Sequence, residues 1–348
     1  MKLGITGLPQ SGKSTIFAAL TGARGEDKFQ GSPRTDQRIG TVRVADERVD
    51  VLTKIYKPKK TTFAQVEYLL PSEISTDTPS KSENLIWNQL RVCDALIHVI
   101  RNFQPPGGPA PTSENDFWRL GEEMVLNDLV VTEKRIERLE QDRKKGKKPE
   151  EAEYSLIKSC RELLENNQPL RMRPDLASAP ALKGFTFLSA KPQLVIINNA
   201  DEDESFPEWK EKPETLEMLI VRGSLEMEIS AMTPEEAEEF LVEYHIEKSA
   251  LDRVIKSSYT LLNLISFFTV LNEEVRAWTI TRGTPALEAA GAVHSDMKKG
   301  FIRAEVLPFG YLEEYGSFQE AKKAGHVHLE GKEYTVQDGD IINFRFNI

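Results

Sequence analysis

Residues 7–15 of the chain read Gly-Leu-Pro-Gln-Ser-Gly-Lys-Ser-Thr. The stretch follows a short apolar run that contains Leu3 and Ile5, and it leads into residues 16–20, whose apolar positions have helical spacing. It therefore fits the pattern G-x-x-x-x-G-K-[ST] in the strand–turn–helix context that this pattern requires. The sequence predicts a phosphate-binding loop between a first strand and a first helix.

The residue types of this loop explain what it can bind. The two glycines let the backbone curl so that successive N–H groups point at phosphate oxygens, at the positive end of a helix. The Lys13 ammonium can reach the β- and γ-phosphates, and the Ser14 hydroxyl is a ligand for the Mg²⁺ that bridges them. Lys13 is thus the candidate catalytic residue and Ser14 a candidate metal ligand. The residues expected to contact the phosphates are Gln10, Ser11, Gly12, Lys13, Ser14 and Thr15.

Composition limits the class of protein. The chain has 348 residues, 39% of them hydrophobic and 29% charged, as in ordinary globular proteins. It contains no apolar stretch of about 20 residues and begins with a strand, so we expect neither a membrane-spanning helix nor a signal peptide. The two cysteines, Cys93 and Cys160, lie far apart and lack the spacing of a metal site, which fits a reducing cytoplasm. The apolar run around His98 predicts that this residue belongs to the core. The net charge of −10 argues against non-specific nucleic-acid binding, and we expect no DNA partner, but a local basic patch is compatible with it.

Strand and helix patterns alternate after the phosphate loop. This alternation predicts an α/β fold, with a mostly parallel sheet covered by helices on both faces. The predicted strands are 41–44, 64–70, 95–100, 194–197 and 219–227, and the predicted helices between them include 46–57 and 84–92.

A segment rich in proline and glycine, residues 104–111, interrupts this pattern. Two long helical patterns follow, and the strand pattern returns at Leu194. We therefore expect a helical arm, residues 112–185, inserted into an α/β domain made of residues 1–111 and 186–264. The basic run 143–148 between the two helices is compatible with a solvated turn and with a docking point for RNA or an acidic partner. Residues 265–348 mix strands and helices and predict a small α+β domain.

Several stretches along nearly the whole chain resemble the YchF (Obg-like ATPase) subfamily of translation-factor-related P-loop GTPases. They are Val-Ala-Asp-Glu-Arg-Val at 44–49, Lys-Pro-Lys-Lys at 57–60, Glu-Val-Arg-Ala-Trp-Thr at 274–279, Lys-Gly-Phe-Ile-Arg-Ala-Glu-Val at 299–306 and Val-Gln-Asp-Gly-Asp at 336–340. The resemblance implies a P-loop G domain, an inserted coiled-coil arm and a C-terminal TGS domain of the β-grasp type. It also implies binding of ATP or GTP with Mg²⁺ in the cytoplasm, and a ribosome or ribosome-associated RNA or protein as partner.

The chain departs from the family at both switch regions, where the metal ligands are expected. Thr35 is the candidate Mg²⁺ ligand of the first switch, although it lies one residue away from the family's position and is compatible with an ordinary surface hydroxyl. At the second switch the family has Asp-x-Ala-Gly-Leu, whereas the strand here ends Glu67-Tyr-Leu-Leu70-Pro71. Glu67 is the candidate for an indirect Mg²⁺ contact. Leu70 and Pro71 restrict the backbone where the family has a glycine.

The residues that would read the base also depart from the usual pattern. Ordinary GTPases use N-K-x-D, in which the Asp accepts from guanine N1 and N2 and the Lys stem packs on the base. The chain has Asn198, Asn199 and Asp201 at these positions, which is also compatible with a plain turn after a strand. The pair Ser230-Ala231 resembles the Ser-Ala loop that completes a base pocket.

Three functions are therefore compatible with the sequence. The first is a slow, Mg²⁺-dependent NTPase that acts as a switch on a ribosomal partner, and the second is a nucleotide-binding scaffold that does not hydrolyse, as the altered switches suggest. The third, an RNA- or protein-binding adaptor without nucleotide, fits poorly with an intact phosphate loop. No residue offers itself as a general base, and in this class positioning and electrostatics drive the reaction.

Overall fold

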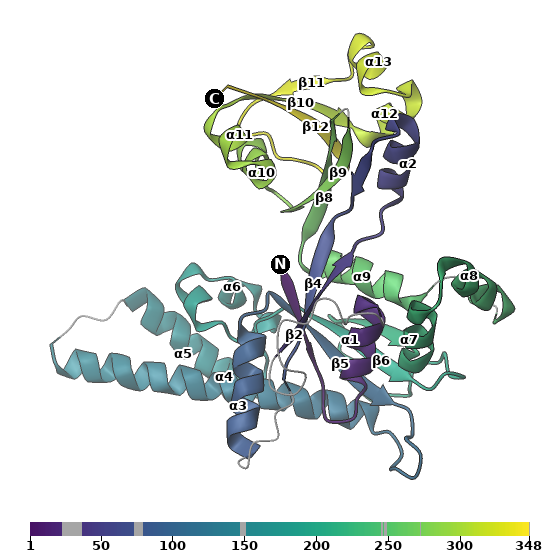
Figure 1. The fold of residues 1–348 in the computed structure, drawn as a ribbon. Coiled ribbons are helices and arrows are strands. Elements are labelled where there is room, and N and C mark those ends of the chain that lie inside the picture. The colour runs from purple at the N-terminus through teal and green to yellow at the C-terminus, as the bar shows by residue number, and fades with distance from the viewer. Residues whose placement is uncertain are drawn as a thin grey trace. The chain divides into compact units, whose positions relative to one another are not determined.

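The computed structural model describes residues 1–22, 37–72, 79–146, 151–244, 246, 249–271 and 273–347. Contacts within the chain group these residues into two compact units (Figure 1). The first unit comprises residues 1–40 and 67–254, and the second comprises residues 41–66 and 255–348.

A mostly parallel sheet forms the centre of the first unit. Its strands run in the order β2-β4-β1-β5-β6-β7, and β1 pairs in parallel with β4 and β5, β5 with β6, and β6 with β7. All residues of β6 are buried, as are the first six of β5, so both faces of the sheet are covered. The predicted α/β fold is confirmed, and the strand at 194–197 lies in the same sheet as residues 3–6. The strands are β1 (Lys2–Thr6), β2 (Arg38–Arg43), β4 (Gln65–Leu70), β5 (Ala95–Asn102), β6 (Gln193–Asn199) and β7 (Glu217–Val221).

A local sequence signal marks the start of α8. This helix begins at Pro234 behind a capping box, in which the Thr233 side chain accepts from the Glu236 N–H and the Glu236 carboxylate accepts from the Thr233 N–H. The helices are α1 (Lys13–Thr21), α3 (Pro79–Arg91), α4 (Ser113–Lys144), α5 (Glu151–Glu165), α6 (Pro174–Ala177), α7 (Gly223–Ala231) and α8 (Pro234–Glu243), with short 3-10 turns at Leu170–Met172 and Pro180–Phe185; α9 (Ala250–Leu261) begins in this unit. None of the helices within the described residues combines the length and the apolar character of a membrane span.

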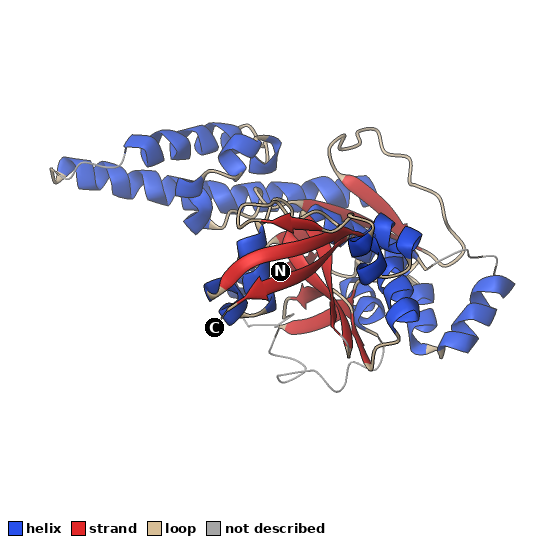
Figure 2. Ribbon diagram, turned by 90° about the horizontal axis from the view of Figure 1, so that it is seen from above, coloured by secondary structure: helices blue, strands red, loops and turns tan. Residues whose placement is uncertain are grey.

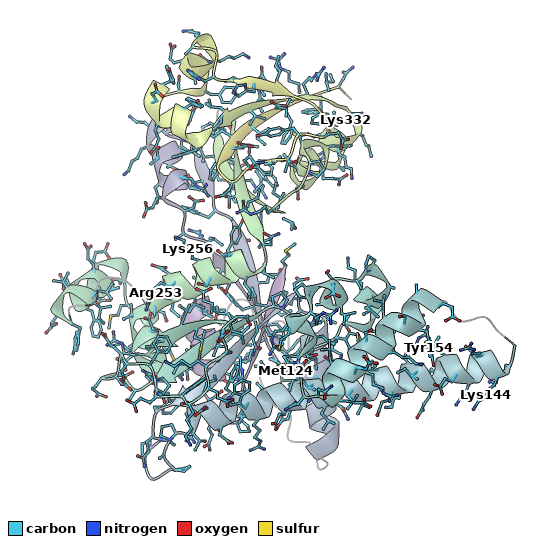
Figure 3. All side chains as sticks on the ribbon, turned by 180° about the vertical axis from the view of Figure 1, so that it is seen from behind. Met124, Lys144, Tyr154, Arg253, Lys256 and Lys332 are labelled. Carbon is cyan, nitrogen blue, oxygen red and sulfur yellow. The ribbon has the colours of Figure 1, made fainter. Side chains whose placement is uncertain are left out.

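Helix α5 lies beside the long helix α4, as Figure 2 shows. Ile136 of α4 and Ile157 of α5 belong to one buried cluster, and Arg135 forms an ion pair with Glu153 at 2.7 Å. Figure 3 shows Met124 and Lys144 on α4, and the helical rise puts the 20 residues between them at about 30 Å. The two helices therefore support each other as a hairpin away from the sheet.

A buried carboxylate fixes α4 to the sheet. Asp128 accepts hydrogen bonds from the backbone N–H groups of Leu188 and Ser189 and forms an ion pair with Arg91 at 3.0 Å. Burial raises the pKa of Asp128, and the two backbone donors and Arg91 oppose this shift. Because these partners precede β6 and end α3, Asp128 ties α4 to the neighbouring elements of the sheet.

The second unit is built on another six-stranded sheet, in the order β11-β10-β12-β8-β9-β3. One strand, β3 (Lys60–Thr62), comes from the N-terminal part of the chain and pairs in parallel with β9. The sequence pattern had placed residues 41–66 with the N-terminal domain, since pairing over more than 200 residues leaves no local signal. The other elements are α2 (Glu47–Tyr56), β8 (Leu264–Leu271), β9 (Glu274–Thr281), α10 (Ala286–Val293), α11 (Ser295–Lys299), β10 (Phe301–Pro308), α12 (Phe309–Tyr315), α13 (Phe318–Lys323), β11 (His328–Glu330) and β12 (Asp340–Phe346).

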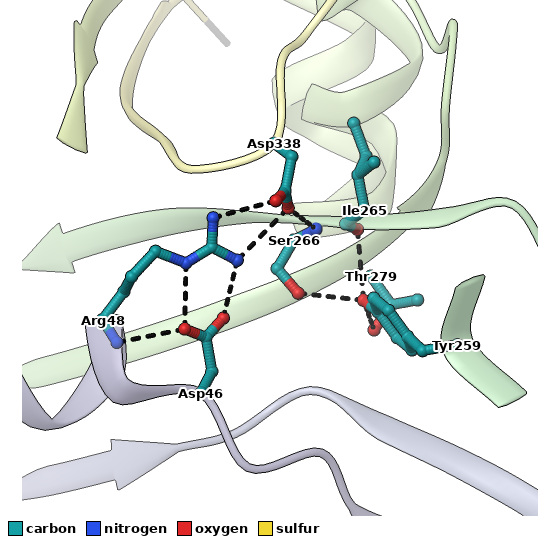
Figure 4. A network of polar contacts seen from close by, with 7 residues as sticks. All are labelled: Asp46, Arg48, Tyr259, Ile265, Ser266, Thr279 and Asp338. Carbon is teal, nitrogen blue, oxygen red and sulfur yellow. Dashed lines mark hydrogen bonds and ion pairs between the residues drawn. The ribbon is translucent and has the colours of Figure 1, made fainter. Parts of the chain in front are cut away.

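The guanidinium of Arg48 joins α2 to the rest of the second unit (Figure 4). It donates to both carboxylate oxygens of Asp46 and to both of Asp338, at 2.8–3.2 Å, and lies 5.1 Å from the centre of the Phe268 ring. Burial lowers the pKa of Arg48, but its hydrogen bonds to Asp46 and Asp338 outweigh this effect and raise the pKa above its ordinary value. Asp338 also accepts from the Ser266 N–H at 2.9 Å, so the network reaches β8.

We expect Arg48→Lys to destabilise the docking of α2 by about 1–2 kcal/mol, because an ammonium cannot donate to two carboxylates in the fork geometry of a guanidinium. Hydrogen exchange of the amides of residues 47–56 should be roughly tenfold faster. Arg303→Lys is the matched control, since Arg303 is exposed and has no carboxylate partner within the described ranges. Equal exchange in both variants would show that the fork is not needed.

Candidate functional site

The loop after β1 has a backbone that only glycine can adopt at two points. Gly7 has φ +155°, and a Cβ there would lie 2.3 Å from the Val99 carbonyl oxygen. Gly12 has φ +90°, and a Cβ there would lie 2.1 Å from Nδ2 of Asn198. Gln10 also has a positive φ, 64°. The loop therefore curls tightly against β5 and β6 before α1 begins at Lys13.

The side chains of the loop suit a bound phosphate. Lys13 Nζ donates to the carbonyls of Gly7 and Leu8, both at 3.0 Å, so its ammonium lies over the loop. Ser11 Oγ is buried and has no hydrogen-bond partner within the described part of the chain. Ser14 is exposed at the start of α1. A glycine cradle, a free hydroxyl and a lysine at a helix N-terminus fit phosphate, with the Ser14 hydroxyl as the group that would hold Mg²⁺.

The side chain of Asn198 joins this loop to the other side of the site. At the end of β6, its Nδ2 donates to the Ser11 carbonyl at 3.0 Å, and its Oδ1 accepts from the Gly223 N–H at 3.0 Å. Asn198 is 3% exposed, so both bonds are shielded from water. The amide thus sets the distance between the phosphate loop and the first residue of α7.

A pocket of about 230 Å³ lies where these elements meet. It opens at the carboxyl ends of β5 and β6, which is where open α/β sheets bind ligands. Its lining comes from the phosphate loop, the two strand ends and the start of α7, and comprises Gly12, Thr15, Phe103, Gln104, Asn198, Asn199, Ala200, Asp201, Glu202 and Ser224. The structure therefore brings together the phosphate loop and the predicted residues Asn198, Asn199 and Asp201.

Several lining residues were not predicted from the sequence, among them Phe103 and Gln104. They directly follow β5, and Gln104 starts the segment 104–111 that we had interpreted only as a break between domains. Their position was the signal that could have identified them as lining residues. They directly follow a buried strand next to β1, and the carboxyl ends of neighbouring parallel strands lie at one edge of the sheet, where ligands bind.

The pair Ser230-Ala231 does not line the pocket. The predicted strand 219–227 ends at Val221, and α7 then runs from Gly223 to Ala231, so the pair lies in the last turn of this helix. The Ser230 hydroxyl donates to the Met227 carbonyl instead. The serine that faces the pocket is Ser224, about two helical turns earlier.

Among the predicted metal ligands, Ser14 lies in the first turn of α1, directly after the phosphate loop. Thr35 lies outside the described residues. Glu67 pairs with Lys2 in the register of β4 and β1, so it lies about 13 Å before the end of β1 from which the phosphate loop starts. The same register sets Leu70 beside Ile5. The end of β4 that faces the loop is therefore apolar, and the position of Glu67 differs from the one predicted.

His98 has the structural role that its apolar neighbours predict. It is 1% exposed, its Nδ1 is 3.0 Å from Nε2 of Gln193, and its ring stacks on Phe117. Burial lowers the pKa of His98 to about 3, helped by Arg171 and Lys13. The ring is neutral at physiological pH and is not available as an acid catalyst.

Together, the sheet order, the glycine cradle and the pocket at the strand ends define an α/β protein of the P-loop NTPase class. Comparison with known proteins narrows this class. The chain is 36% identical to a ribosome-binding ATPase YchF from Bacillus subtilis over 362 aligned residues, covering 99% of each chain, and 37% identical to one from Pasteurella multocida, covering 100% of this chain and 99% of that one. A solved structure of the Schizosaccharomyces pombe YchF GTPase superposes with a TM-score of 0.85 at 26% identity, covering 99% of this chain and 97% of that chain.

The second unit also has a match of its own. The family model YchF-GTPase_C, described as a protein of unknown function (DUF933), matches residues 264–347. The chain belongs to the YchF family, as the resemblance predicted.

We expect Gly12→Ala to lower the free energy of unfolding by about 1–3 kcal/mol, because alanine is strained at φ +90° and its Cβ would displace the Asn198 amide. Gly121→Ala is the control, since Gly121 lies inside α4 with open space around its Cβ position and should gain helix propensity. Denaturant unfolding of both variants measures the difference. Similar stability of the two would contradict the contact between Gly12 and Asn198.

Proposed function

We propose that the chain binds a purine nucleoside triphosphate, ATP or GTP, with Mg²⁺, and acts as a ribosome-associated switch protein in the cytoplasm. The geometry of residues 7–15 is the observation that carries this proposal. Two glycines that accept no side chain, a lysine over the loop and a buried serine hydroxyl without a partner in the described residues form a site for a triphosphate.

Each part of the site would have a distinct role. The backbone N–H groups of residues 10–15 would hold the phosphate oxygens, and Lys13 would move from the carbonyls of Gly7 and Leu8 to the β- and γ-phosphates. Mg²⁺ on the Ser14 hydroxyl would neutralise charge on those phosphates. The pocket of 230 Å³ beside the loop would accept the base.

The proposed partner comes from the relatives. Those from Bacillus subtilis and Pasteurella multocida are named ribosome-binding ATPases and match the chain over its full length. The domain division predicted from the sequence, with a G domain at 1–111 and 186–264, an arm at 112–185 and a TGS domain at 265–348, remains part of this proposal, except that residues 41–66 group with the second unit. Arg143 and Lys144, at the end of α4, give the arm a basic tip that suits RNA.

Hydrolysis is proposed to be slow. In P-loop proteins the strand beside the loop usually ends in a carboxylate that helps to hold Mg²⁺. Here Leu70 and Pro71 are buried at that strand end, and Ser72 is held by Gln89, whose Oε1 accepts from the Ser72 N–H at 3.0 Å. Because the end of β4 is fixed and apolar, positioning of a γ-phosphate and a water would depend on other groups. A nucleotide-binding scaffold without hydrolysis is the second candidate, favoured by the same observation.

We expect the purified protein to turn over ATP and GTP with kcat below about 1 s⁻¹, under the usual enzyme range.

Lys13→Ala should weaken binding of both nucleotides, since it removes the ammonium that neutralises the phosphates. The control is Lys183→Ala, which changes an exposed lysine outside the site and should leave binding unchanged. Calorimetric titrations, a phosphate-release assay and cosedimentation with ribosomes test the three parts of the proposal. Fast turnover by the protein alone, or unchanged affinity in Lys13→Ala, would contradict it.

A further inference from the structure

The start of helix α7 belongs to the pocket. The Gly223 N–H donates to Asn198 Oδ1 at 3.0 Å, and the Leu225 N–H donates to Asp201 Oδ1 at 3.2 Å. Ser224, between these two residues, lines the pocket. A Cβ on Gly223 would lie 2.7 Å from Asn198 Oδ1, so the backbone of α7 approaches β6 as closely as a chain can. The position of α7 therefore fixes one wall of the pocket.

About one turn further along α7, a buried carboxylate holds the start of another helix. Glu226 is 3% exposed and belongs to the same buried face as Leu225 and Ile229. Its Oε2 accepts from the Ser249 hydroxyl at 2.5 Å, and its Oε1 accepts from the N–H of Ala250, the first residue of α9, at 2.6 Å. Both oxygens of the carboxylate are thus used at the start of α9.

The start of α9 supplies what a buried carboxylate needs. A helix leaves its first N–H groups without partners inside the helix, and its N-terminus carries a partial positive charge. No lysine or arginine of the described ranges forms an ion pair with Glu226, so the charge is balanced by these hydrogen bonds and by the helix dipole. Ser249 completes the cap, because its hydroxyl oxygen accepts from the Leu251 N–H at 3.1 Å. Moving either helix would leave buried polar groups without partners.

Helix α7 must therefore be in place for two separate contacts. A nucleotide that contacts Ser224 requires the start of α7, and the cap on Ala250 requires Glu226 of the same nine-residue helix. A ligand that binds one state of an equilibrium stabilises that state, and other contacts that depend on the state are stabilised with it. The equilibrium here is the opening and closing of the first turn of α9.

The position of α9 in the chain gives this equilibrium its interest. Residues 250–254 of the helix belong to the first unit and residues 255–261 to the second, so the chain leaves the first unit through α9. An effect of nucleotide on the start of α9 would thus act on the segment that leads out of the nucleotide-binding unit.

We propose that Glu226 is a positioning residue that couples nucleotide binding in the pocket to the capping of α9. Bound nucleotide favours α7 in place and thereby the capped first turn of α9, and the capped turn in return favours nucleotide binding. This inference rests on the proposed nucleotide binding, and it adds the part of the fold that responds to the nucleotide.

Two substitutions of Glu226 and one control test the coupling. Glu226→Ala removes both acceptors, whereas Glu226→Gln keeps the length of the side chain and one acceptor oxygen but removes the charge. Glu228→Gln is the matched control, because Glu228 lies on the same helix and is exposed. Hydrogen exchange of the Ala250 amide is measured on the full chain, without nucleotide and with saturating ATP, and calorimetry gives the affinity for ATP.

Without nucleotide, we expect the Ala250 amide to exchange about tenfold faster in Glu226→Ala and about threefold faster in Glu226→Gln, and at an unchanged rate in Glu228→Gln. Saturating ATP should slow this amide at least about threefold in the unaltered protein and in Glu228→Gln, but not in Glu226→Ala. Because coupling is reciprocal, the affinity of Glu226→Ala for ATP should fall by the same factor by which ATP slows the exchange. A purely structural role of Glu226 would not produce this equality.

Equal slowing by ATP in the unaltered protein and in Glu226→Ala would overturn the inference, and so would unchanged Ala250 exchange when ATP is bound to the unaltered protein. If Glu226→Ala did not fold, Glu226→Gln would decide, since full slowing by ATP in this variant would contradict the role of the carboxylate. If calorimetry showed no nucleotide bound to the unaltered protein, the proposed function would fail and the coupling with it. Exchange of Ala250 without nucleotide would then still show whether Glu226 caps α9.

Discussion

The site depends on one buried amide. Asn198 donates to the Ser11 carbonyl and accepts from the Gly223 N–H, and so it joins the phosphate loop to α7 across the ends of β1 and β6. It also explains why residue 12 is glycine, since the amide occupies the space that a Cβ would need. A buried amide with both of its groups bonded has one favourable geometry, because any displacement leaves a polar group without a partner.

This constraint separates the polar residues around the pocket into two groups. Asn198, Asn199 and Asp201 hold elements of the protein together, whereas Lys13 and Ser14 lie where phosphates and Mg²⁺ would bind. The phosphate end of the site is thus specific in its chemistry, and the base end is specific mainly in its shape. The apolar end of β4 agrees with this division. A site that holds a nucleotide does not require a carboxylate at that position, whereas a site for rapid hydrolysis does.

How far the sequence predicts the structure depends on how local each feature is. The phosphate loop was predictable because its glycines, lysine and flanking elements lie within about 20 residues. The strand pattern of β5 and β6 was predictable for the same reason. Glu67 was misplaced because a strand pattern does not reveal its register, and a shift of a few residues moves a side chain to the other end of the sheet.

Other features could not be found in the sequence because they depend on distant pairing. Residues 60–62 lie in the segment that the sequence assigned to the N-terminal domain, yet β3 pairs with β9 in the second unit. The lining of the pocket is a similar case: Ser224 and Ser230 both follow β7, and only the start of α7 at Gly223 decides that Ser224 lines it.

The most direct test of the account is the affinity of Asn198→Ala for ATP, measured by calorimetry beside Asn166→Ala, an exposed asparagine at the end of α5. Removing the amide leaves the Ser11 carbonyl and the Gly223 N–H without their partner, which costs about 1–3 kcal/mol. We expect ATP to bind roughly tenfold or more weakly to Asn198→Ala, although no residue of the phosphate loop is changed. Unchanged affinity in this variant would show that the loop holds its shape without Asn198 and would contradict the account.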